Sequence, residues 1–108
     1  MSAGKIRAIV KRPDEKYGHV TNISCTLKNL QRIVEGPIEV VRITEKIACI
    51  CNEEGKIRAL QRNFSLGRPP FCDLIVGEAA IVGVDGEEFV DLDMTFQAWK
   101  NLLKVWGN

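Results

Sequence analysis

The sequence has few of the features that mark specialised protein classes. No stretch approaches the roughly 18 apolar residues of a membrane-spanning helix, and only 6% of the residues are aromatic. Neither a G-x-G-x-x-G fingerprint nor a P-loop occurs, so no glycine loop for phosphate is present. The four cysteines lack the paired spacing of a zinc knuckle. These absences argue against a membrane span, a bound cofactor and a metal centre.

The composition that remains is that of an ordinary globular protein, with 45% hydrophobic and 27% charged residues. A length of 108 residues suits one domain with one main core, and we therefore predict a single domain over residues 1–108. The segment Met1–Gly4 leads directly into a charged stretch and not into the apolar region of a signal peptide. We therefore expect a cytoplasmic protein whose cysteines pack as small hydrophobic residues.

Charge is balanced over the whole chain but not along it. The net charge is +1, yet residues 1–34 sum to +5 and residues 69–108 sum to −5. A domain without a basic surplus is a poor candidate for direct nucleic-acid binding. The acidic last third instead predicts a surface for a protein partner of basic character. The carboxylates proposed for this partner are those of Asp85, Glu87, Glu88 and Asp91.

Alternating apolar residues and turn signals predict a series of hairpins. The expected strands are Lys5–Lys11, His19–Ile23, Ile38–Thr44, Ile47–Asn52, Lys56–Leu60, Asp73–Val84 and Phe89–Leu92. The segment Gln61–Pro70 is predicted to be a loop, because Gly67, Pro69 and Pro70 interrupt helices and sheet ladders alike.

Apolar residues three and four apart predict two helices. The first covers Leu27–Val34, with Ser24 or Thr26 as its N-cap and a stop at Gly36. The second carries an apolar stripe that includes Trp99 and Trp106, and Asp93 is its expected N-cap.

The resulting element order, β-β-α-β-β-β-β-β-α, contains no repeating βαβ unit. It predicts an α+β fold with a mixed or mainly antiparallel sheet of hairpins and two helices on one face of that sheet. Sheet edges made of short strands can also pair between copies, which leaves a homo-oligomer open.

Candidate catalytic groups are sparse. His19 has no neighbouring nucleophile, and we interpret it as a strand-edge histidine. Cys49 and Cys51 share a strand face and could hold a soft metal if Cys25 or Cys72 folded over them, but a packing role suits their apolar surroundings better. We therefore predict no enzyme, no catalytic residue and no metal ligand; a hydrolase using His19 or Mg²⁺-binding carboxylates is the least supported alternative.

One segment does offer groups for a ligand. Guanidinium, amide and hydroxyl groups lie close together between residues 62 and 68, with further basic residues a few positions earlier. Such groups bind anionic, nucleotide-like ligands. The candidate ligand-binding residues are Lys56, Arg58, Arg62, Asn63 and Arg68.

The middle of the chain also resembles a known family. The likeness lies in Gly36–Val41, Cys49–Lys56, the loop around Asn63 and Ile75–Gly83, and it extends from about Lys5 to Leu92. These segments resemble small domains of unknown function found in phages, plasmids and integrative elements of Gram-positive bacteria. The resemblance implies a mobile-element origin and an accessory role, with no catalytic residues to transfer. It singles out positions Asn52, Glu53, Gly55, Lys56 and Asn63.

Together these observations predict a non-enzymatic accessory protein of a phage or mobile element. It would act in the cytoplasm of the bacterial host by binding a host component, in host takeover or counter-defence. The alternative is a protein that binds and sequesters a nucleotide signal.

Overall fold

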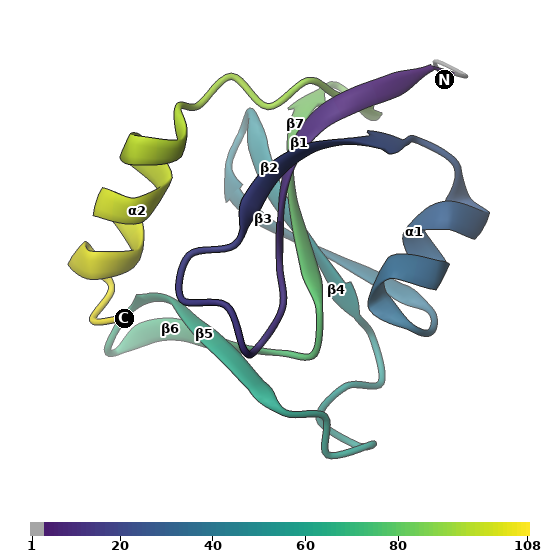
Figure 1. Ribbon diagram of the computed structural model, residues 1–108. Helices are drawn as coiled ribbons and strands as arrows, with labels where there is room; N and C mark the ends of the chain where they lie inside the picture. The colour runs from purple at the N-terminus through teal and green to yellow at the C-terminus, as the bar shows by residue number, and fades with distance from the viewer. Residues whose placement is uncertain (1–3) are drawn as a thin grey trace.

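The computed structural model describes residues 4–108, so the first three residues, on which the expectation of a missing signal peptide rests, lie outside the described part of the chain. It is an α+β fold with antiparallel sheets and two helices, as predicted (Figure 1). Neither helix within residues 4–108 is long and apolar enough to cross a membrane. The strands are β1 (Lys5–Lys11), β2 (His19–Ser24), β3 (Ile38–Thr44), β4 (Ile47–Asn52), β5 (Arg62–Arg68), β6 (Phe71–Val76), β7 (Ala79–Asp85) and β8 (Glu88–Val90), and the helices are α1 (Leu27–Val34) and α2 (Phe96–Val105).

The main sheet has the order β2-β1-β7-β4-β3, and β8 pairs with β7. All of its pairings are antiparallel. The central strand β7 lies between β1 and β4 and is buried from Ala79 to Val84, which explains its continuous apolar sequence. At Gly83 a Cβ atom would stand 2.2 Å from the carbonyl oxygen of Asp91, so the return of the chain past β7 requires glycine there.

The two helices lie on opposite sides of the main sheet (Figure 1). Leu30 and Val34 of α1 lie in one core cluster with Ile50 of β4, whereas Trp99 and Leu103 of α2 lie in the cluster on the other face. The prediction that both helices cover one face is therefore wrong. Successive strand residues point to opposite faces, and here both faces are apolar, so each face needs its own cover.

The second face is closed by α2 together with a separate hairpin of β5 and β6. Trp99 packs edge-to-face against Phe64 of β5 with 5.6 Å between ring centroids. The indole N–H of Trp99 donates to the carbonyl of Tyr17 at 2.8 Å. This contact satisfies the one polar group of a fully buried tryptophan and ties α2 to the turn between β1 and β2.

Threonines cap both helices. The Thr26 side chain accepts from the N–H of Asn29, which confirms one of the two caps predicted for α1. The predicted cap of α2, Asp93, is wrong, because Thr95 accepts from the N–H of Ala98 at 3.0 Å and α2 begins at Phe96. Asp93 lies two positions before Thr95, and Met94 between them forms a bend.

In residues 56–70 the strand and the loop are exchanged relative to the sequence prediction. In Lys56–Leu60, expected as a strand, residues 56–59 form consecutive turns, whereas the expected loop Gln61–Pro70 contains strand β5. The prolines follow the end of β5 and occupy the turn to β6, where they remove no ladder donor. The expected long strand Asp73–Val84 is divided at Gly77, which adopts φ +73 between β6 and β7.

Candidate functional site

The five predicted ligand-binding residues do not converge. Arg62 and Arg68 lie at opposite ends of β5, about 20 Å apart along an extended strand of this length. Arg62 donates to the hydroxyl of Ser65 at 3.1 Å. The two guanidinium groups therefore cannot bind one small anion together.

Lys56 and Arg58 bind separate partners in the turn after β4. The Lys56 ammonium lies 2.9 Å from the carboxylate of Asp73, and this hydrogen bond raises the pKa of Lys56. Arg58 donates to the carbonyl of Glu35 at 2.8 Å, beside the C-terminus of α1. Both side chains help to hold the turn to its neighbours in the fold.

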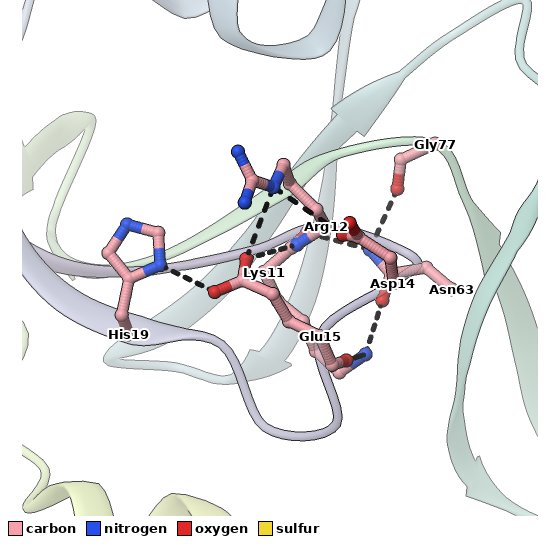
Figure 2. A network of polar contacts seen from close by, with 7 residues as sticks. All are labelled: Lys11, Arg12, Asp14, Glu15, His19, Asn63 and Gly77. Carbon is pink, nitrogen blue, oxygen red and sulfur yellow. Dashed lines mark hydrogen bonds and ion pairs between the residues drawn. The ribbon is translucent and has the colours of Figure 1, made fainter.

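Asn63 lies in a buried network at one end of the main sheet (Figure 2). Its amide nitrogen donates to the carbonyls of Lys11 at 2.8 Å and Gly77 at 2.7 Å. Its amide oxygen accepts from the Lys11 ammonium at 2.7 Å. One side chain therefore connects β5 to β1 and to the turn that precedes β7, and its donors and its oxygen are occupied within the protein.

Lys11 has a structural role that the sequence analysis does not predict. Lys11 is buried, with a relative exposure of 3%, and within residues 4–108 its ammonium group bonds a carbonyl and an amide oxygen and no carboxylate. The ammonium donates to the carbonyl of Glu15 at 2.7 Å and lies 5.8 Å from the ring centroid of Phe64. Burial lowers the pKa of Lys11. Its partner Asn63 is 52 residues away, so no local pattern pointed to this role.

His19 stands at the exposed start of edge strand β2, as predicted. Its Nδ1 lies 2.8 Å from Glu15, whose other carboxylate oxygen accepts from the backbone N–H of Arg12 at 2.9 Å (Figure 2). Burial favours the neutral form of Glu15, but these hydrogen bonds outweigh it and lower the pKa of Glu15. The pair closes the turn between β1 and β2.

The predicted acidic surface gathers mainly at the other end of the main sheet. Asp85, Glu87 and Glu88 are exposed around the turn between β7 and β8. Arg42 of β3 donates to the carbonyl of Gly86 at 3.3 Å and to that of Glu45 at 3.0 Å. The turns at residues 45–46 and 85–88 are thereby held together, and we call these residues the hairpin end.

Asp91, the fourth predicted acidic residue, has a different environment. Its carboxylate accepts from the backbone N–H of Arg7 at 2.7 Å. The Arg7 guanidinium in turn donates to the carbonyls of Leu92 at 2.6 Å and Met94 at 2.8 Å. The basic first third and the acidic last third of the chain therefore meet at this place.

The cysteines are distributed over both faces and the surface. Cys25 lies in the core beneath α1, Cys49 and Cys51 lie on the opposite face of the sheet, and Cys72 is exposed. The structure does not bring Cys25 over the other pair. Within residues 4–108 no group of three or more histidine, cysteine or acidic side chains is arranged to hold a metal ion.

Comparison with known proteins assigns the family. No significant match was found among curated proteins or among solved structures. The sequence does match the family described as Domain of unknown function (DUF3846) over residues 6–104, which is most of the chain. The chain therefore belongs to the DUF3846 family of domains of unknown function.

Proposed function

We propose that this protein is a non-enzymatic binding protein whose hairpin end engages a basic host protein. It would act in the cytoplasm of a bacterial host as an accessory protein of a phage or mobile element, in host takeover or counter-defence. The observation that carries the proposal is the grouping of Asp85, Glu87 and Glu88 on one exposed turn.

The turn that presents these carboxylates is well anchored. It continues the buried central strand β7, and Arg42 bonds its backbone from the neighbouring hairpin. The backbone of Val84 also donates to the carbonyl of Lys46 at 2.8 Å. A preorganised group of like charges steers an oppositely charged partner and loses little conformational freedom on binding.

Asp91 would contribute to binding of the partner only indirectly. Because its carboxylate is bonded to the backbone of Arg7, it supports the base of β8 and is less available to a partner. The binding surface proposed here is therefore narrower than the acidic segment suggested by the sequence.

The nucleotide-binding alternative has weaker support. Its residues are dispersed, and Lys56 and Asn63 are each bonded within the protein. A thermal-shift screen with linear and cyclic nucleotides addresses it directly, because a ligand at 100 times its Kd stabilises the folded state by about 2.7 kcal/mol. A reproducible shift with any of them would favour the alternative.

The main test compares two variants with the same change in charge. Asp85→Asn with Glu87→Gln removes two charges from the hairpin end, and Glu53→Gln with Glu54→Gln removes two from an exposed turn elsewhere. Each tagged variant is used to capture partners from a lysate of a Gram-positive host at about 50 mM and about 500 mM salt, where exposed charges are weakly and strongly screened respectively.

The proposal expects one basic protein to be captured by the wild type and by the Glu53/Glu54 variant at low salt. Its recovery should fall at least about tenfold with the Asp85/Glu87 variant, because an interface of complementary charge loses affinity when the charges are removed. Equal recovery with all three proteins, or recovery unaffected by salt, would contradict binding through the hairpin end.

A further inference from the structure

The outer edge of strand β2 presents backbone groups that the main sheet does not use. β2 pairs with β1 on one side and ends the sheet. In an antiparallel pair, hydrogen-bonded and non-hydrogen-bonded residue pairs alternate. The N–H of Cys25 donates to the carbonyl of Gly4, which identifies that pair as hydrogen-bonded. The residues of β2 that bond β1 are then every second one, namely His19, Thr21 and Ile23. The N–H and C=O groups of Val20 and Asn22 therefore point away from β1.

The partner of Asn22 on β1 confirms this alternation. Arg7 lies opposite Asn22, but its N–H donates to the carboxylate of Asp91 and its carbonyl accepts from the N–H of Leu92. The backbone of Arg7 is thus directed away from β2. Asn22 is exposed and Val20 is 42% exposed, and within residues 4–108 neither has a further backbone hydrogen bond.

The two edges of the main sheet differ in how they are protected. β3, at the other edge, carries the charges of Glu39 and Arg42 and has a register shift between Arg42 and Thr44. Charged residues and bulges hinder the addition of another strand. β2 keeps an unbroken register with β1, and its one ionisable residue is His19 at its start. The edge at β2 is therefore the one suited to strand addition.

A groove of about 660 Å³ runs between β2 and helix α1. Thr21 and Ile23 of β2 line one side of it, and Asn29, Arg32 and Ile33 of α1 line the other. Its volume is within the range of known ligand-binding clefts. A strand added to β2 would direct every second side chain towards α1.

One end of this groove is basic. Lys5 lies opposite Ser24 at the end of β2. The Arg32 guanidinium donates to the amide oxygen of Asn29 at 2.7 Å, and the amide nitrogen of Asn29 donates to the carbonyl of Ser24 at 2.9 Å. Asn29 thus holds Arg32 near the same end. Within residues 4–108 neither Lys5 nor Arg32 has a carboxylate partner, so both cations are available to a ligand.

The other end of the groove is acidic. Glu35 follows the last turn of α1, and Glu78 directly precedes Ala79, which lies opposite Lys11. Both carboxylates are therefore near the His19 end of β2, about 17 Å along the strand from its Ser24 end. This separation favours an acidic residue of a ligand at the Ser24 end and disfavours one at the His19 end.

We propose that the groove binds an extended segment of a partner protein, which adds an antiparallel strand to β2 and places a carboxylate beside Arg32. The backbone groups of Val20 and Asn22 bond the main chain of this segment, and Arg32 selects an acidic residue in its N-terminal half. In strand addition, main-chain hydrogen bonds supply affinity and side-chain contacts supply specificity. The groove shares no residue with the hairpin end, so the inference is independent of the proposed function.

The probe is the heptapeptide acetyl-Glu-Thr-Glu-Val-Thr-Val-Thr-amide, whose two glutamates face α1 near Ser24 when the peptide adds to β2. It is titrated into the isotope-labelled full chain and amide hydrogen exchange is followed by NMR. We expect exchange of the Val20 and Asn22 amides to slow at least about tenfold at saturation, because these N–H groups gain acceptors. Exchange at Thr21 and Ile23, which are already bonded to β1, should change less than about threefold.

Two N-methylated peptides test the predicted pairing. Methyl groups on the second, fourth and sixth nitrogens block the N–H groups that face β2, and binding should weaken at least about tenfold. Methyl groups on the third, fifth and seventh nitrogens face away from β2, and affinity should stay within about threefold. An equal effect of the two methylation patterns would overturn the proposal.

Matched charge variants test the role of Arg32. Arg32→Gln should weaken binding at least about threefold, whereas Lys28→Gln removes a charge from α1 outside the groove and should leave the affinity unchanged. A peptide with glutamine in place of both glutamates should bind the wild type and Arg32→Gln equally well. Equal affinity of the two variants for the acidic peptide would overturn the proposal. Absence of binding at about 1 mM peptide, or slowed exchange away from β2 alone, would do the same.

Discussion

The two ends of the main sheet use polar residues in opposite ways. At the hairpin end, charged side chains are exposed on turns, and the backbone carbonyls of those turns are bonded by Arg42. At the other end, which we call the network end, Lys11, Asn52 and Asn63 are buried and bond backbone carbonyls or N–H groups. The comparison separates polar residues that are buried and build the fold from charged residues that are exposed to solvent.

The reason lies in the path of the chain. At the hairpin end, strands turn back through short, exposed connections that water can solvate. At the network end, the chain leaves the main sheet for the β5–β6 hairpin, and carbonyls near the junction lose their strand partners. A buried carbonyl without a partner is costly, so side-chain amides take the place of the missing strand. Substitutions at the two ends should therefore differ in their effect on stability.

The largest effect is expected at the network end for Asn63→Ala. The substitution removes two donors to carbonyls and leaves the Lys11 ammonium buried with one fewer oxygen. We expect the free energy of unfolding to fall by about 3–5 kcal/mol, as for other broken buried charge networks. Urea denaturation measures it, with Asn22→Ala on the exposed edge strand as the control. A loss below about 1 kcal/mol would remove the distinction between the two ends.

Asn52→Ala should have the next largest effect. The amide nitrogen of Asn52 donates to the carbonyl of Val34 at 2.9 Å, and its oxygen accepts from the N–H of Glu54 at 2.7 Å. Because no buried charge is involved, the expected loss is about 1–3 kcal/mol. The same denaturation assay ranks it against Asn63→Ala, and equal losses would show that the Lys11 ammonium adds nothing to the network.

Gly86→Ala tests the backbone of the hairpin end. Gly86 has φ +63, and a Cβ atom there would meet nothing within 4 Å. The expected destabilisation is therefore that of a left-handed alanine without a clash, about 1 kcal/mol. Thermal unfolding measures the change; Gly107→Ala, with φ +88 and also no neighbour within 4 Å of the added Cβ atom, is the matched comparison and should cost about as much. A loss above about 3 kcal/mol would indicate a tertiary role for this turn.

Removing charge from the hairpin end should hardly change stability. We expect Asp85→Asn with Glu87→Gln to shift the free energy of unfolding by less than about 0.5 kcal/mol, because exposed charges contribute little. The Glu53→Gln/Glu54→Gln variant should show a similarly small change in the free energy of unfolding in the same denaturation assay. A larger loss in the first variant would mean that these carboxylates serve the fold and not a partner.

The smallest effect concerns alkaline pH. The lowered pKa of Lys11 means that the folded protein releases this proton at a lower pH than the unfolded chain does. In the window between the two pKa values the unfolded state binds more protons, so the contribution of Lys11 to stability rises with pH. The stability of the wild type relative to Lys11→Met should therefore increase as pH approaches 10.5. A difference that stays constant or decreases with pH would contradict this linkage.

Local patterns predicted the elements whose determinants are close in sequence. The hairpin of β1 and β2, the hairpin of β3 and β4, and helix α1 with its Thr26 cap are where turn chemistry and periodicity placed them. The exposed carboxylates around Asp85 were also located from a turn signal. These features depend on contacts between residues a few positions apart.

The errors have two different causes. Gly67 and the following prolines predict a loop where strand β5 forms, but the strand ends before the prolines and pairs with β6. The sequence predicts that Asn63 binds a ligand, whereas in the fold its side chain accepts a hydrogen bond from Lys11, 52 residues away. The contact between Asn63 and Lys11 has no local signal, whereas the β5–β6 hairpin joins neighbouring residues such as Arg68 and Phe71.

The sequence by itself determined the fold class, most hairpins, both helices and the concentration of acidic residues in the last third of the chain, because these follow from periodicity, turn chemistry and composition. The tertiary structure decided which sheet face each helix covers, which carboxylates remain exposed and which polar side chains are buried. An apolar stripe on a helix shows that the helix must pack against another apolar surface, and a buried amide needs hydrogen-bond partners. Neither pattern shows which residues those partners are. Cys51 illustrates the same limit: its spacing from Cys49 follows from the sequence, but its place beside a cleft with Lys56 follows from the packing of β6 against β4.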